Sequence, residues 1–202
     1  GYTKFKKLSG ETFNFFMKKP GYDTLRFLLC EKAILVEGDA DELVVQKAYL
    51  NKHNKLPIED EVDVISVGTS FLRFLEIADL IKKNTIVVTD NDGDIEALEK
   101  KYENYLGKNE KEYVKVVYDK STHIEQGSLI AKNGGKFNYD TLEPCLLRAN
   151  DLKTLNEILD LSKESDDDLI KYMVSNKTEC ALKIFDTKES ISFPDYIEDA
   201  IK

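Results

Sequence analysis

The stretch 31-EKAILVEGDADELVVQKAYL-50 decides the fold. Its residues 33–37 form a continuous apolar run that ends in a glutamate, of the type that is buried on both faces of a parallel sheet. The run stops at Glu37-Gly38, and residues 43–49 then place apolar side chains at helical spacing. The stretch therefore predicts a strand, a tight turn and a helix, with an unusual concentration of carboxylates at the turn.

The same unit recurs further along the chain. Strands are expected at residues 62–68, 85–90 and 113–118, and helices at 22–32, 70–83 and 94–107. Strands that alternate with helices of this length indicate βαβ units. Right-handed crossovers place the carboxyl ends of all these strands on one edge. The predicted fold class is α/β, a Rossmann-like parallel sheet flanked by helices.

The alternation ends after Tyr118, and the rest of the chain is of a different kind. Residues 119–141 are expected to form a loop, and two helices are expected at 151–161 and at about 167–186. We therefore expect a helical C-terminal extension on the sheet. This organisation divides the chain into a lead-in or linker at 1–30, a core at 31–122, and a C-terminal loop and helical extension at 123–202.

Composition excludes several classes of protein. The 202 residues are 42% hydrophobic and 33% charged, and no run of about 18 apolar residues or signal peptide occurs, so we expect a cytoplasmic protein without a membrane partner. The three cysteines are widely spaced and form no CxxC motif, which argues against a disulfide framework or a zinc site. The net charge of -9 argues against a protein that coats nucleic acid by bulk attraction, but not against an enzyme whose carboxylates bind cations.

Acidic side chains gather at the ends of two predicted strands. Glu37 ends one strand, and 89-TDNDGD-94 ends another. In open α/β sheets, ligands bind beyond the carboxyl ends of the strands. If these strands are neighbours, Glu37 meets Asp90 and Asp92, and Asp41 lies one helical turn beyond Glu37. Their mutual repulsion calls for a hard divalent cation, and ligands that are all oxygen favour magnesium or manganese over zinc.

These carboxylates also have a purely structural interpretation. Aspartate after a strand is often a helix N-cap, and Asp-Gly is often only a turn. We expect Asp94 to be such a cap, and Asp39 and Glu42 to complement the helix dipole. Because the two motifs occur at equivalent strand ends, the metal site is the favoured interpretation.

The same residues carry a resemblance to a known family. Val36-Glu37-Gly38 with Asp41, followed by Asp90-Asn91-Asp92-Gly93, resembles the Toprim domain shared by topoisomerases, bacterial primases and certain nucleases. Further segments resemble the OLD (overcoming lysogenization defect) nucleases, in particular the nuclease subunit of the Gabija antiphage system: 21-GYDTLR-26, 34-ILVEGDADELVVQKAY-49, 65-ISVGTSFLRFLEIADL-80 and 141-TLEP-144. The resemblance covers roughly residues 21–202.

The resemblance implies a Toprim fold and a metal-dependent DNA endonuclease that hydrolyses phosphodiester bonds with two Mg²⁺ or Mn²⁺ ions. It implies that the first ion is held by the acidic residues of the two strand ends, with Glu37 also a proton acceptor. These ligands are Glu37, Asp41, Asp90 and Asp92. Glu143, in the Thr-Leu-Glu motif, would serve the second ion.

A lysine on a C-terminal helix would complete the implied site. Lys177, in 177-KTECA-181, fits that description, and Lys183 is the alternative, although either can be an ordinary solvated charge. Gly68-Thr69-Ser70 can offer backbone N–H groups and hydroxyls to a DNA phosphate, or can simply cap the following helix.

No other catalytic arrangement competes with this one. His53 and His123 are the only histidines, and both are expected to be surface or loop residues. None of the ten tyrosines is marked by its context as a strand-transferring nucleophile. Two alternatives stay open: another Toprim enzyme, such as a primase or topoisomerase fragment, and a non-catalytic Toprim DNA-binding module.

The resemblance also implies partners. They are DNA, an ABC-type ATPase domain ahead of this segment in the full-length chain, a helicase-like partner protein, and further copies in a homo-oligomer. Residues 1–202 contain no GxxxxGK[ST] motif, so this segment is not expected to bind ATP through a P-loop. The sequence begins at Gly1, and we expect it to be a fragment of an ATP-regulated antiphage protein.

Overall fold

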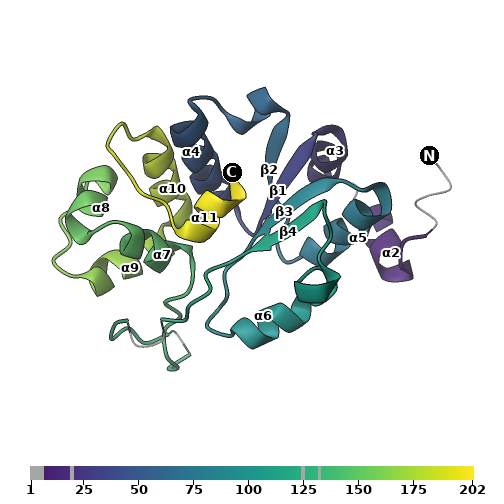
Figure 1. The fold of residues 1–202 in the computed structure, drawn as a ribbon. Helices are drawn as coiled ribbons and strands as arrows, with labels where there is room; N and C mark the ends of the chain where they lie inside the picture. The colour runs from purple at the N-terminus through teal and green to yellow at the C-terminus, as the bar shows by residue number, and fades with distance from the viewer. Residues whose placement is uncertain (1–6, 19–20, 124–125, 132) are drawn as a thin grey trace.

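A parallel sheet forms the centre of the molecule (Figure 1). The structure is a computed structural model, and it describes residues 7–18, 21–123, 126–131 and 133–202. Its four strands lie in the order β2-β1-β3-β4. They are β1 (Lys32–Val36), β2 (Val62–Ser66), β3 (Asn84–Val88) and β4 (Val114–Val117). All three neighbouring pairs are parallel, which confirms the predicted α/β class.

Both faces of the sheet are covered by helices, which explains why the strands are apolar throughout. Ile34 and Val36 point into one hydrophobic cluster, and Ala33 and Leu35 into another. The first cluster packs under α4 (Asp39–His53) and the C-terminal helices, and the second under α3 (Tyr22–Leu29) and α5 (Phe71–Ile81). The two layers lie on opposite sides of the sheet in Figure 1.

The remaining helices complete these layers. On the side of α5 they are α2 (Gly10–Lys18) and α6 (Ile95–Lys101). On the side of α4 they are α7 (Leu142–Ala149), α8 (Leu152–Leu159), α9 (Asp166–Ser175), α10 (Lys177–Asp186) and α11 (Asp195–Ala200). Two short 3-10 helices, Pro57–Asp60 and Gly107–Asn109, lie in the connections before β2 and β4. The C-terminal extension is thus helical, as expected.

The structure corrects the sequence prediction at several helices. The single helix expected at about 167–186 is wrong, because Asn176 leaves the helical conformation and α10 begins afresh at Lys177. The helix expected at 94–107 ends at Lys101, where Tyr102 turns into the core and is fully buried. Asp23 does not cap α3, since Gly21 holds that position. The prediction also missed α2, α7 and α11.

Two local expectations hold in the structure. The Asp94 carboxylate accepts the Ala97 N–H at 2.9 Å, so Asp94 is the N-cap of α6. Glu42 lies in the first turn of α4, where it complements the helix dipole. Its carboxylate also accepts from Arg26 Nη2 at 2.9 Å and from the Ser66 N–H at 3.0 Å, which ties α3, α4 and β2 together.

Arg26 is the centre of this network, and removing it is expected to destabilise the fold. Its guanidinium donates to both carboxylate oxygens of Asp63, at 3.0 and 2.7 Å, and to Glu42. The side chains of all three are mostly buried. We expect Arg26→Met to lower the free energy of unfolding by about 3 kcal/mol, because two carboxylates lose their cation.

Urea denaturation measures this loss. Lys153→Met is the control, since Lys153 is 84% exposed and pairs with Glu157 on the surface of α8. Such a pair contributes at most about 1 kcal/mol. Equal stability of the two variants would contradict the role given to Arg26.

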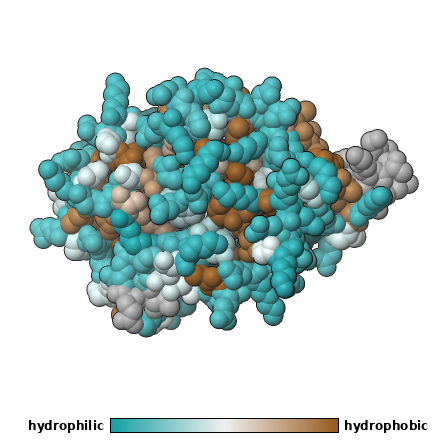
Figure 2. Space-filling view, viewed as in Figure 1, coloured by the Kyte–Doolittle hydropathy of each residue, from teal (hydrophilic) through white to brown (hydrophobic). Residues whose placement is uncertain are grey.

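Two further features of the molecule concern its hydrophobicity: that of its helices and that of its surface. None of the helices in the described ranges is long and apolar enough to cross a bilayer. Figure 2 shows that the face seen in Figure 1 is mostly hydrophilic, with apolar side chains in separate patches.

Candidate active site

Acidic side chains converge at the carboxyl edge of the sheet, as the sequence predicts. The expectation depended on β1 and β3 being neighbours, and they pair in parallel, with Leu35 opposite Val87. Glu37 therefore follows β1 beside Asp90, which follows β3. A small pocket at this edge is lined by Glu37, Asp41 and Asp90.

Asp41 is held by the turn that precedes α4. Its Oδ2 accepts the Gly38 N–H at 3.0 Å, so it also closes the N-terminus of the helix. Burial, together with the charges of Glu143 and Glu37, raises the pKa of Asp41 to about 6, against the Gly38 hydrogen bond and the charge of Lys177. The Asp41 carboxylate thus caps α4, while burial and the neighbouring carboxylates destabilise its charged form.

Asp90 lies deeper in the same cluster. Burial raises its pKa well above the ordinary value, and the charges of Asp41, Glu143 and Asp92 act in the same direction, against Lys177. A neighbouring cation would therefore stabilise the charged form of Asp90.

Glu143 and Lys177 form an ion pair beside these aspartates. Lys177 Nζ lies 3.0 Å from Glu143 Oε1. Burial works to lower the pKa of Lys177, but the charges of Glu143, Asp41 and Asp90 together outweigh it, so the pKa is raised. Because the helical conformation breaks between α9 and α10, Lys177 is the first residue of α10. Glu143 lies in the first turn of α7, where Pro144 is tolerated.

Lys183, the alternative lysine, is not part of this cluster. It lies on α10, and its ammonium donates to the Leu159 carbonyl at 2.7 Å, at the end of α8. It also lies 3.8 Å from Glu179 on its own helix. Of the two lysines, the structure brings only Lys177 to the carboxylates.

Asp92 and Glu37 lie at the exposed rim of the cluster. Asp92 has a left-handed backbone with φ of 52° and accepts from Asn138 Nδ2 at 3.0 Å. The Glu37 carbonyl accepts the Gly68 N–H at 3.0 Å, and the Ser70 N–H donates to the Val67 carbonyl at 3.2 Å. The backbone N–H groups of Gly68 and Ser70 are thus bonded within the protein, and Ser70 is the N-cap of α5 without a side-chain capping bond. Phosphate binding by this turn stays a prediction that depends on Thr69 and on the hydroxyl groups.

The donor set fits a hard divalent cation. Within the described ranges, no three carboxylate, imidazole or thiol groups already stand close enough to enclose an ion. However, Glu143 Oε2 is buried, and no hydrogen bond from a described residue reaches it. An unsatisfied buried oxygen beside Asp41 and Asp90, both with raised pKa values, is the environment that a bound cation stabilises.

Sequence reasoning missed Tyr196 and Asn138. Tyr196 is buried on α11 and lines the same pocket as Asp41 and Asp90. Pro194 just before it, a residue typical of helix starts, was the available signal. Asn138 comes from the loop before α7, and nothing in its local sequence links it to Asp92.

The raised pKa of Asp41 predicts a pH dependence of stability in divalent-free buffer. The folded pKa of about 6 exceeds the ordinary value of 3.8, so the unfolded chain loses this proton first as the pH rises. Stability is therefore lost between about pH 4 and pH 6, by about 3 kcal/mol for this group. Asp41→Asn removes the titration and keeps an acceptor for Gly38, so its unfolding free energy should fall less over this range. Parallel pH profiles for the two proteins would contradict the burial of the Asp41 charge.

Comparisons with known proteins give a related family and a shared fold. Residues 28–92 match the family described as "Overcoming lysogenization defect protein-like, TOPRIM domain". No curated protein sequence matches the chain. The C-terminal region of the Xanthomonas campestris pv. campestris OLD protein is similar in structure, with a TM-score of 0.57 and 21% identity, over 87% of this chain and 92% of that one.

A second solved structure gives the same result. The C-terminal region of the Burkholderia pseudomallei OLD protein has a TM-score of 0.57 and 20% identity, over 85% of this chain and 95% of that one. The matched range 28–92 includes Glu37, Asp41, Asp90 and Asp92. Residues 28–92 thus match the OLD-like Toprim family, and the chain as a whole shares the fold of the C-terminal regions of OLD proteins.

Proposed function

We propose that this protein is a metal-dependent endonuclease that hydrolyses phosphodiester bonds of DNA. The observation that carries the proposal is the convergence of Asp41, Asp90 and Glu143 around Lys177, with one Glu143 oxygen buried and unsatisfied. The match to an OLD-like Toprim domain supports the same class of activity.

Each residue has a role in this proposal. Glu37, Asp41, Asp90 and Asp92 would hold one divalent ion, Mg²⁺ or Mn²⁺, and Glu143 would serve a second. Bound ions of this kind neutralise charge on the phosphate and lower the pKa of a water ligand. Glu37, exposed at the rim, accepts the proton of the attacking water. Lys177, with its raised pKa, stays charged and stabilises the negative charge that develops on a phosphate oxygen.

The proposal extends to the biological setting that the sequence resemblance implies. There, this segment is the nuclease part of a cytoplasmic, ATP-regulated antiphage protein that follows an ABC-type ATPase domain and forms homo-oligomers. A Gabija-type system would add a helicase-like partner protein. The comparisons name OLD proteins and not Gabija, so this narrower assignment depends on the sequence resemblance alone.

Cleavage of supercoiled plasmid tests the proposal. With Mg²⁺ or Mn²⁺ we expect nicked or linear product, and with EDTA intact plasmid. A topoisomerase would instead produce relaxed closed circles, and a non-catalytic module would bind DNA without cutting it. Intact plasmid in both metals would contradict the proposal.

A matched pair of glutamate variants tests the assignment of the site. Glu37→Ala should fold, as judged by circular dichroism, and lose cleavage. Glu157→Ala, which removes an exposed carboxylate of α8, should cut as the wild type does. Unchanged cleavage by Glu37→Ala would remove Glu37 from the mechanism.

A further inference from the structure

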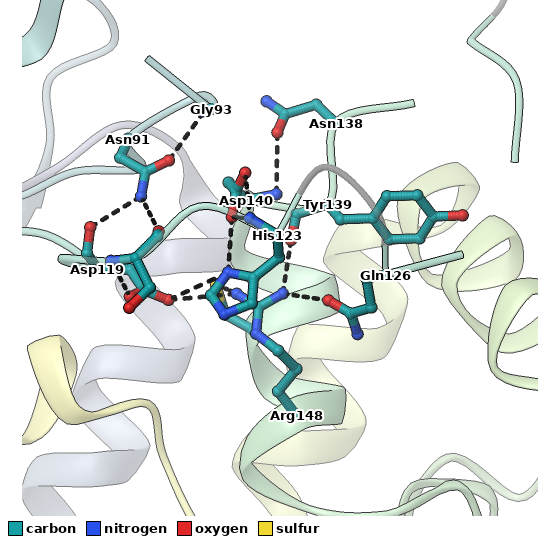
Figure 3. A network of polar contacts seen from close by, with 11 residues as sticks. Asn91, Gly93, Asp119, His123, Gln126, Asn138, Tyr139, Asp140 and Arg148 are labelled. Atoms are coloured by element: carbon teal, nitrogen blue, oxygen red, sulfur yellow. Dashed lines mark hydrogen bonds and ion pairs between the residues drawn. The ribbon is translucent and has the colours of Figure 1, made fainter. Parts of the chain in front are cut away.

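A network of polar contacts joins the turn after β3 to the loop after β4 (Figure 3). Asn91, between Asp90 and Asp92, is buried. Its Nδ2 donates to the carbonyls of Asp119 and Ser121, at 2.8 and 2.7 Å, and its Oδ1 accepts the Gly93 N–H at 2.8 Å. The loop is therefore fixed at a definite position relative to the catalytic aspartates.

A second tie runs through Asn138. Its Nδ2 donates to Asp92 Oδ1 at 3.0 Å, and its Oδ1 accepts the Asp140 N–H at 2.9 Å. Asp140 also lies close to the turn itself, since a Cβ on Gly93 would come within 3.5 Å of its Oδ2. Asp140 is thus only one hydrogen-bonded residue away from Asp92.

Asp140 orients the side chain of His123. Its carboxylate, 1% exposed, accepts the His123 N–H at 2.8 and 3.1 Å and lies 2.8 Å from Nδ1. A buried carboxylate at this position places a proton on Nδ1 and fixes the plane of the ring. In Figure 3 the imidazole is held at its Nδ1 edge, and no contact joins Nε2 to another labelled residue.

Nε2 faces a groove rather than a protein partner. No hydrogen bond connects it to any residue in the described part of the chain. His123, 27% exposed, lines a groove of about 1080 Å³ together with Lys120, Ser121 and Arg148. Tyr196 lines both this groove and the acidic pocket, so the two share a wall.

Donors and acids are unevenly distributed along this groove. Around His123 the groove is lined by Lys120, Ser121 and Arg148 and by one acid, Asp119, which lies 3.3 Å from Arg148 Nη2 and 3.9 Å from His123 Nδ1. Further acids and two lysines also line the groove: Glu110, Glu112, Asp195, Asp199, Lys111 and Lys115. An anionic ligand is therefore expected near His123, where donors outnumber acids.

We propose that His123 Nε2 contacts a phosphate oxygen of the DNA backbone next to the bond that is cut. This inference rests on the proposed nuclease function. The carboxylates of the site repel DNA, so the adjoining nucleotides need hydrogen-bond donors at the rim, and His123 is the oriented one. Asp140 has a positioning role, because it holds the ring with Nε2 directed to the groove.

Two substitutions separate contact with DNA from support of the loop. The amide nitrogen of His123→Asn stands near the position of Nδ1 and can donate to Asp140, but nothing replaces Nε2. His123→Gln places its amide nitrogen near the position of Nε2. We expect the Asn variant to keep its melting temperature and its Mn²⁺ affinity, while KM for a DNA duplex rises about tenfold. The Gln variant should recover part of this loss.

An experiment on the wild type needs no substitution. The chain has two histidines, and His53 Nε2 is bonded to the Ile201 carbonyl at 2.8 Å, so His53 serves as an internal reference. In ¹⁵N-histidine-labelled protein without divalent metal, a short DNA duplex is expected to shift the Nε2 resonance of His123 and to leave that of His53 unchanged.

The outcomes distinguish this inference from the proposed function. If the wild type cuts DNA, and His123→Asn has the same KM or the His123 resonance does not move, only the phosphate contact is overturned. If the wild type neither binds nor cuts DNA, the proposed function and the contact fail together.

Discussion

Asp90→Asn is expected to abolish metal-dependent DNA cleavage and to stabilise the metal-free protein. Asp90 lies within the acidic cluster, where burial and the charges of Asp41 and Glu143 raise its pKa. A neutral amide of the same shape removes that repulsion, so the melting temperature in EDTA should rise by several degrees. The amide is a poor ligand for a hard cation, so we expect the cleavage rate to fall about a thousandfold.

The two readouts must change together for this prediction to hold. Thermal unfolding in EDTA and plasmid cleavage in Mg²⁺ are measured on the same preparations. Asp39→Asn is the matched control, because Asp39 is exposed in the first turn of α4 and should leave both unchanged. An Asp90→Asn protein that unfolds earlier than the wild type would show that the carboxylate is a structural acceptor rather than a repelled charge.

Lys177→Met is expected to lower the cleavage rate by at least about a hundredfold, whereas Lys183→Met should leave it near that of the wild type. Lys177 is the cation next to Glu143, and Lys183 donates to the Leu159 carbonyl instead. Lys177→Met should also destabilise the metal-free protein by about 1–2 kcal/mol, because Glu143 stays buried without its partner. The estimate is at the low end because Lys177 is half exposed.

Adding a divalent metal distinguishes the loss of cleavage from the loss of stability in Lys177→Met. Saturating Mn²⁺ stabilises the folded state by mass action, so it should restore the stability of Lys177→Met without restoring cleavage. Lys183→Met should gain no more stability from Mn²⁺ than the wild type gains, so its deficit relative to the wild type should remain, since its contact is to a backbone carbonyl outside the acidic cluster. A Lys183→Met protein that folds but does not cut would transfer the catalytic role to that lysine.

The loop before α7 shows why part of the site could not be predicted from sequence. Asn138 and His123 come from a segment without apolar periodicity, and their partners are Asp92 and Asp140. Such contacts depend on where the chain returns in space. His123 was expected to be an ordinary loop residue, and only its contact with a buried carboxylate indicates more.

The sequence by itself determined the α/β class, the strands and the acidic residues at their ends. These follow from local physics: a strand covered on both faces must be apolar throughout, and its first polar residues mark the sheet edge. The tertiary structure decided that β1 lies beside β3, that Lys177 rather than Lys183 reaches Glu143, and that Tyr196 lines the pocket. Those choices depend on strand order and helix packing, which join residues far apart in the chain and leave no periodic pattern in it.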